Sequence, residues 1–267
     1  MKGLDVYWDN REAGIEEYEE LLCRRDQLNK EASSLQISYT LEFGELITEI
    51  FENKVECIKK KKQIAFCQKQ INRGESINVD LMNSMVDQDM QLYYYQLDEL
   101  MRNNKAAKES RTVDDFRIRR SKRLYRRLAK MLHPDINRRT REENELRDLW
   151  ERVYDAYIRS DVEALEDLEV LARKVMEDYG MDGFTYIIDD LEDRIDRVQR
   201  QINEILTTEP YTYRELLYND EKKAELKEKL ENEKEEYRKY MEELADTLEG
   251  LLKSGGMSFI WKMNGLN

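Results

Sequence analysis

The chain has 267 residues, of which 39% are charged, and it carries a net charge of −13 at pH 7 with a mean hydropathy of −0.87. Only 2 prolines and 10 glycines interrupt it, and no apolar run approaches the ~20 residues of a membrane-spanning helix. This composition argues against a membrane protein and against one large globular core, and it favours long helices with thin cores. We therefore expect an all-α protein without a membrane partner.

Residues 11–71 carry apolar side chains at helical spacing and predict one long helix or two nearly collinear ones. The Asn-Arg-Gly-Glu-Ser stretch at 72–76 predicts a turn, after which a return helix is expected over about 77–108. The return helix is about half as long as the outgoing one, so residues 11–38 need another apolar partner. We expect a coiled-coil hairpin over residues 1–110.

The next segment, 111–180, predicts helices over about 113–132 and 143–159, then a third over 161–178. Residues 117–141 contain eleven Lys or Arg and one acid, a net charge of +10 that leaves −23 for the remainder of the chain. Such a concentrated cationic site on an acidic protein is a candidate recognition surface.

The first of these helices has one apolar face and one basic face, the basic face carrying Arg123, Arg126, Arg127 and Lys130. Pro134 disfavours helical geometry at His133, so the helix is expected to end there. The next helix has an apolar face of its own. The two helices are expected to pack antiparallel, with His133, Pro134 and Asp135 at the exposed turn of a helical hairpin.

Residues 181–253 repeat the design of the N-terminal part. A seam of apolar residues three and four apart runs from Ile188 to Ile205, a turn follows around Pro210, and a final helix extends to about residue 252. We expect a C-terminal coiled-coil hairpin, followed by a flexible apolar tail over 254–267.

The central hairpin resembles the J-domain of DnaJ-type co-chaperones over about residues 113–160. In that family a basic helix of the form YRKLA leads into a His-Pro-Asp loop, and the following helix carries an F…I…AY pattern. This sequence has Tyr-Arg-Arg-Leu-Ala at 125–129, then His-Pro-Asp at 133–135, then Trp150, Val153, Ala156 and Tyr157 at the matching spacing. It departs from the family in two ways. The interval 103–115 lacks the YxxLG-type first-helix motif, and Ile136 replaces a commonly basic residue.

The resemblance implies docking on a DnaK-type chaperone ATPase and stimulation of its ATP hydrolysis, with no catalytic residue in this chain. Arg123, Arg126, Arg127 and Lys130 would steer docking, and His133, Pro134 and Asp135 would make short-range contacts. Tyr125 and Asn137 complete the expected site. The coiled-coil arms would hold an unknown client or scaffold and offer a route to a homodimer. The return helix near 92–101 is the first candidate to replace the missing first helix.

Two alternatives stay open: a structural coiled-coil scaffold with a degenerate J-like hairpin, and a nucleic-acid-binding factor, which the overall acidity disfavours. His133 is the only histidine, and the three cysteines are not spaced as zinc ligands. We therefore expect neither a metal nor a cofactor. An odd number of cysteines on predicted helices and an N-terminus without a signal-peptide core favour the cytoplasm.

Overall fold

A computed structural model describes residues 2–110, 115–180 and 190–254, which form ten helices and no strand, so the expected all-α class is confirmed. The described residues divide into two units. The first comprises those of Met1–Gln36 and Arg111–Arg214, and the second those of Ile37–Ser110 and Glu215–Asn267.

This division differs from the three contiguous modules expected over 1–110, 111–180 and 181–253. The N-terminal hairpin is split between the units, and the two long C-terminal helices do not pair with each other but pack in different units. Helical periodicity shows which face of a helix is apolar, but it does not show which neighbour covers that face. The expected tail lies, except for Ser254, outside the described residues.

The longest element, α1 (Lys2–Asn72), is a single helix of 71 residues, as the pattern over 11–71 predicts. It ends where the turn at 72–76 is expected, because Gly74 adopts a left-handed conformation with φ 69° that suits glycine. The Glu75 N–H then donates to the Gln70 carbonyl at 3.0 Å.

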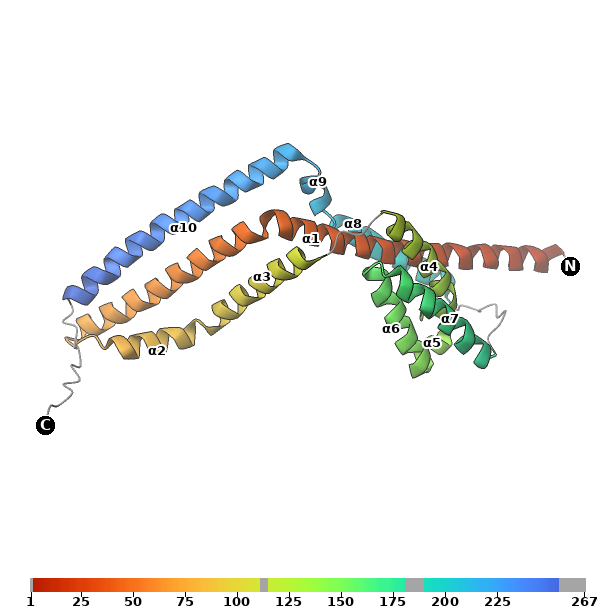
Figure 1. Cartoon of the computed structure of the whole chain (residues 1–267), viewed down its shortest axis with the longest axis horizontal. Helices are drawn as coiled ribbons and strands as arrows, with labels where there is room; N and C mark the ends of the chain where they lie inside the picture. Colours follow the sequence, from red (N-terminus) through yellow and green to blue (C-terminus); the bar gives the residue numbers. More distant parts are fainter. Residues whose placement is uncertain (1, 111–114, 181–189, 255–267) are drawn as a thin grey trace. The chain divides into compact units, whose positions relative to one another are not determined.

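In the second unit, α1 from residue 37 onward packs with α2 (Val79–Asp89), α3 (Gln91–Glu109) and α10 (Asp220–Ser254). Figure 1 shows α3 and α10 running alongside this part of α1. The return helix expected over 77–108 is thus two helices that meet at Met90. The final helix is likewise divided, into α9 (Tyr213–Leu217) and α10. Two buried apolar clusters of the second unit are formed by residues of α1, α2 and α10, of the α1–α2 turn and of the α2–α3 junction: Val55, Cys57, Ile64, Cys67, Ile77, Met82, Val86, Met90 and Leu244.

Gly44 of α1 lies against α3. The side-chain amide of Asn104 donates to the Gly44 carbonyl at 2.9 Å and to Thr48 Oγ1 at 2.7 Å. A Cβ added at Gly44 would lie 2.1 Å from Asn104 Oδ1. Glycine at this position therefore permits a close polar contact between the two helices and does not break α1.

The first unit contains α4 (Asp115–Leu132), α5 (Arg138–Glu142), α6 (Asn144–Ile158), α7 (Val162–Asp178) and α8 (Leu191–Thr207). The three helices predicted over 113–132, 143–159 and 161–178 are α4, α6 and α7, whereas the single-turn α5 was not predicted. Figure 1 shows α4, α6 and α7 gathered together beside the N-terminal part of α1. They share one buried core, to which α1 adds Cys23.

The opposite side of α1 packs on α8. Tyr18, Leu22 and Leu28 of α1 form a second cluster with Val198 and Ile202 of α8 and with Ile136 of the α4–α5 loop. The apolar partner that residues 11–38 require is therefore supplied within the first unit, by α8 on one side and the α4–α6–α7 core on the other.

None of the helices in the described part of the chain combines the length and the apolar composition that crossing a bilayer requires.

We predict opposite effects for two glycine-to-alanine substitutions in helix interiors. Gly250→Ala in α10, where an added Cβ meets no atom within 4 Å, should raise the free energy of unfolding by about 0.5–1 kcal/mol. Gly44→Ala should lower it by about 1 kcal/mol, because Asn104 must give up two hydrogen bonds. Urea denaturation followed by circular dichroism measures both.

The matched background for this prediction is Asn104→Ala, in which Gly44→Ala should lose most of its destabilising effect, since Thr40 Cγ2 at 3.0 Å is then the remaining close neighbour of an added Cβ. A Gly44→Ala substitution that destabilises the Asn104→Ala chain as strongly as the unsubstituted chain would show that the α1–α3 contact does not determine the effect at residue 44.

Candidate interaction site around the His-Pro-Asp loop

The His-Pro-Asp loop joins two helices that pack antiparallel. The ring of His133, which follows α4, lies 4.8 Å from that of Trp150 early in α6, while Tyr125 in the middle of α4 stacks on Tyr157 near the end of α6 at 4.0 Å. Later residues of α6 therefore meet earlier residues of α4. Helices α4 and α6 lie antiparallel and are joined by the loop and the short α5.

Asn137 holds the loop against the end of α4. Its side-chain amide donates to the Met131 carbonyl at 2.9 Å, and its side-chain oxygen accepts from the Arg139 N–H at 3.0 Å and so caps α5. The Asn137 N–H donates to the His133 carbonyl at 2.7 Å. Since Asn137 is fully buried, its role in this structure is to shape the loop.

His133 is buried, with 3% of its surface exposed, whereas the sequence predicts it in an exposed turn. Its Nδ1 accepts the Asp135 N–H at 3.0 Å, so the neutral ring carries its proton on Nε2. Nε2 lies 3.3 Å from Arg25 Nη2 and 3.8 Å from Asp26 Oδ2. Because both nitrogens of that 3.3 Å contact carry hydrogens, the Asp26 carboxylate is the acceptor that Nε2 faces. Burial lowers the pKa of His133 to about 4.

Asp26 of α1 is the buried acid at the centre of this site, with 3% of its surface exposed. Its Oδ1 accepts from Arg25 Nε at 3.0 Å and Nη2 at 2.8 Å, and its Oδ2 accepts from the Tyr125 hydroxyl at 2.6 Å. Burial and then the Asp26 charge raise the pKa of Tyr125 above its ordinary value. A buried carboxylate with three such donors ties α1 to α4.

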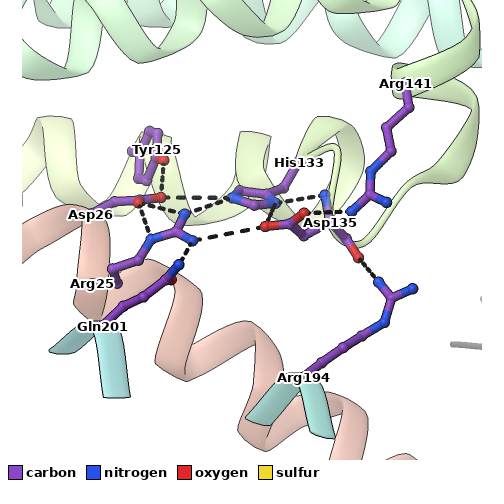
Figure 2. A network of polar contacts seen from close by, with 8 residues as sticks. All are labelled: Arg25, Asp26, Tyr125, His133, Asp135, Arg141, Arg194 and Gln201. Carbon is purple, nitrogen blue, oxygen red and sulfur yellow. Dashed lines mark hydrogen bonds and ion pairs between the residues drawn. The ribbon is translucent and has the colours of Figure 1, made fainter. Parts of the chain in front are cut away.

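Figure 2 shows how the network continues through the loop to α8. The Asp135 carboxylate lies 2.5 Å from Arg141 Nη2 and 3.8 Å from Arg25 Nη1. Arg25 Nη1 also donates to Gln201 Oε1 at 3.3 Å, and Arg194 Nη1 donates to the Asp135 carbonyl at 3.4 Å. The loop is therefore held from α1, α5 and α8.

A pocket of about 280 Å³ opens beside the loop. Among the described residues, no group of His, Cys, Asp and Glu side chains is arranged to hold a metal ion. Its polar groups include the neutral His133 imidazole and the Asp26 carboxylate, whose charge is balanced by Arg25. The residues that line the pocket are Arg25, Asp26, Asn29, His133, Pro134, Asp135, Trp150 and Tyr154.

The basic residues of α4 separate into two sets. One set forms ion pairs with α7: Arg117 with Glu163 at 2.5 Å, Arg127 with Glu169 at 2.8 Å, and Arg120 with Glu166. Lys130 pairs with Glu19 of α1 at 2.8 Å. The other set forms no ion pair with any residue that the structure describes; it comprises the exposed Arg119, Arg123 and Arg126 and the half-buried Lys122.

The nine residues predicted from the sequence therefore fall into three groups. His133, Pro134, Asp135, Tyr125 and Asn137 meet at the loop, Arg123 and Arg126 lie on the exposed face of α4, and Arg127 and Lys130 are engaged within the chain.

Sequence reasoning missed the partners of the loop, which are Arg25, Asp26, Arg141, Arg194 and Gln201. One signal was available in α1. Asp26 lies four residues after Leu22 and eight after Tyr18, so it is a charged residue on the apolar seam. A buried acid at a seam position requires a polar partner. The expected stand-in for the missing first helix, 92–101, belongs to the other unit; residues 23–30 of α1 contact α4 and α6 instead.

The burial of His133 predicts a pH dependence of stability. Below pH ~6.5 the unfolded imidazole is protonated, whereas the folded one stays neutral until about pH 4, so the unfolded state binds more protons in this window. The free energy of unfolding should therefore fall as pH decreases, by roughly 2 kcal/mol between pH 7 and pH 5. Urea denaturation at each pH measures it.

His133→Gln is the control for this linkage, since the chain has no other histidine. The variant should lose most of the change between pH 7 and pH 5, a range above the ordinary carboxylate pKa values. An equal pH dependence in both proteins would contradict a buried, neutral His133.

Comparison with protein-family models, with curated proteins and with solved structures finds no match to this chain. The loop and its surroundings are therefore interpreted from their own geometry and from the sequence pattern.

Proposed function

We propose that this chain is a J-domain-like co-chaperone that docks on a DnaK-type chaperone ATPase and stimulates its ATP hydrolysis. The observation that carries the proposal is the packed hairpin itself, in which a basic helix and an antiparallel partner flank a His-Pro-Asp loop. Tyr125, Trp150 and Tyr157, on which the resemblance rests, pack against one another. The chemistry would belong to the ATPase, so the chain would be a regulator and not an enzyme.

Of the four basic residues predicted to steer docking, Arg123 and Arg126 are best suited to attract the ATPase. Both are exposed and unpaired among the described residues, so a partner's carboxylates need displace no existing ion pair. Clustered charge of this kind accelerates association. Arg127 and Lys130 would contribute less, because each must first leave an acid of its own chain.

The burial of His133 gives it a different role in this proposal from that of Asp135. The Asp135 side chain is 33% exposed and that of His133 is 3% exposed, so the ATPase would meet the loop at Pro134 and Asp135. His133 would be a positioning residue, which holds the Asp135 N–H and packs on Trp150. The second unit would carry the client or scaffold to which the ATPase is recruited.

The first prediction of the proposal concerns ATP hydrolysis. In single-turnover assays the chain should stimulate a DnaK-type ATPase from its own host, and His133→Gln should abolish the stimulation because the loop loses its internal support. Circular dichroism of the variant controls for unfolding. Failure of the chain to stimulate any such ATPase of the host would refute the proposal.

The second prediction concerns the charge on α4. Arg123→Glu combined with Arg126→Glu should raise the chain concentration for half-maximal stimulation about tenfold, and it should weaken the dependence on salt. The control is the same double reversal at Lys227 and Lys229 of α10, which are also exposed. If both pairs of reversals weaken stimulation equally, net charge matters and the α4 surface does not.

The ion pairs of the loop favour a second candidate, a structural coiled-coil scaffold whose J-like hairpin is degenerate. Asp135 is paired with Arg141 and lies near Arg25, so both polar members of the tripeptide are engaged within the chain. This candidate predicts no stimulation, and it predicts that His133→Gln changes stability alone.

A further inference from the structure

The second unit exposes a line of large apolar side chains on α2 and α3. Leu81, Met85, Leu92 and Tyr95 are 47%, 53%, 65% and 60% exposed. Helical spacing places Leu81 and Met85 on one face of α2, and Leu92 and Tyr95 on one face of α3, away from the buried residues Met82, Val86 and Met90. We call these four residues the α2–α3 ridge.

The surroundings of the ridge differ from the solvated helix faces of this chain. The other exposed positions between 81 and 96 carry one charge only, and they are Ser84, Gln88, Asp89, Gln91 and Gln96. That charge, Asp89, pairs with Lys62 at 2.8 Å. In a chain with 39% charged residues, a face without free charge that carries Met and Tyr has the composition of an interface core.

The ridge crosses the junction of α2 and α3, where the chain bends (Figure 1). Met90 keeps a right-handed helical conformation (φ −92°, ψ −4°), its N–H donates to the Val86 carbonyl at 3.0 Å, and the Tyr94 N–H donates to the Met90 carbonyl at 3.1 Å. At ~1.5 Å per residue the ridge is ~21 Å long. It is long enough for a helix–helix contact of several turns.

The apolar residues of the ridge are spaced nearly symmetrically about Gln88. Leu81 and Tyr95 each lie seven residues from Gln88, and Met85 and Leu92 lie three and four residues from it. A two-fold axis at Gln88 therefore places Leu81 of one copy opposite Tyr95 of the other, and Met85 opposite Leu92. This self-complementary arrangement is what an isologous interface requires. The junction at Met90 lies two residues from the axis, so the bends of the two copies flank the axis symmetrically.

We propose that the α2–α3 ridge is a homodimer interface, in which α2 and α3 of two copies pack antiparallel about a two-fold axis at Gln88. The scarcity of charge favours a second copy of this chain as the occupant. A different protein would find few charges on the ridge with which to pair specifically, whereas two copies of an uncharged ridge do not repel each other. A pair of Gln88 amides at the axis sets the register, as a buried polar residue does in coiled coils. Four large side chains bury less than the ~800 Å² per partner of a standard interface, so the dimer is weak and depends on concentration.

Sedimentation velocity of the full chain over a range of concentrations tests the proposal. The chain should shift from monomer to dimer as its concentration rises, and Met85→Glu with Leu92→Glu should abolish the shift. Val170→Glu, at a residue of α7 that is 71% exposed, is the control and should leave it unchanged. A monomer at every concentration, or a dimer that survives the double substitution, would overturn the proposal.

Cysteine cross-linking tests the direction of packing, since all three native cysteines are buried. Gln88→Cys should form a disulfide-linked dimer under mild oxidation. A mixture of Leu81→Cys and Tyr95→Cys chains should form mixed dimers in preference to either homodimer. Preferential Leu81–Leu81 linkage would indicate parallel packing. A chain that dimerises only after residues 255–267 are deleted would assign the ridge to that segment. Either result contradicts the proposed interface.

Discussion

The first unit depends on one buried carboxylate. Asp26 has 3% of its surface exposed, and the cost of burying its charge is met by Arg25 and by the Tyr125 hydroxyl. Tyr125 lies on α4 and the His133 ring stands 3.8 Å from the same carboxylate, so one acid of α1 lies against both α4 and the loop that follows it. Removing any donor would leave a buried charge short of a partner, which costs more than the loss of an exposed ion pair.

Ion pairing within the chain also divides the basic residues of α4 into those that bind acids of this chain and those that remain available to a partner. Side chains directed toward α7 meet Glu163, Glu166 and Glu169 and are neutralised locally. Exposed ion pairs of this kind contribute little stability each, but they remove charge from the surface. What remains for a partner on α4 is the smaller set Arg119, Lys122, Arg123 and Arg126, so a net charge of +10 over residues 117–141 overstates the charge available for docking.

The sequence predicts individual helices better than their partners. Apolar spacing, Pro134 and Gly74 identify α4, α6, α7 and the end of α1 within a few residues, because these signals are local. The pairing of α8 with residues 18–28 of α1 was not predictable, since many apolar faces of similar width compete for each other. In the candidate site, Tyr125, His133 and Asn137 were predicted, whereas the donor Arg25 came from a distant part of the chain. The exposure of His133 was predicted wrongly, because the helix that covers it is 108 residues away in sequence.

The central claim is that α1 covers the His-Pro-Asp loop and keeps its histidine neutral. Nitrogen NMR of the imidazole tests it most directly, because the chain contains a single histidine and its two ring nitrogens report tautomer and charge separately. The structure predicts one tautomer at neutral pH, with the proton on Nε2 and a bare Nδ1, and no protonation until about pH 4. A ring that exchanges between both tautomers and titrates near its ordinary pKa of ~6.5 would contradict the account.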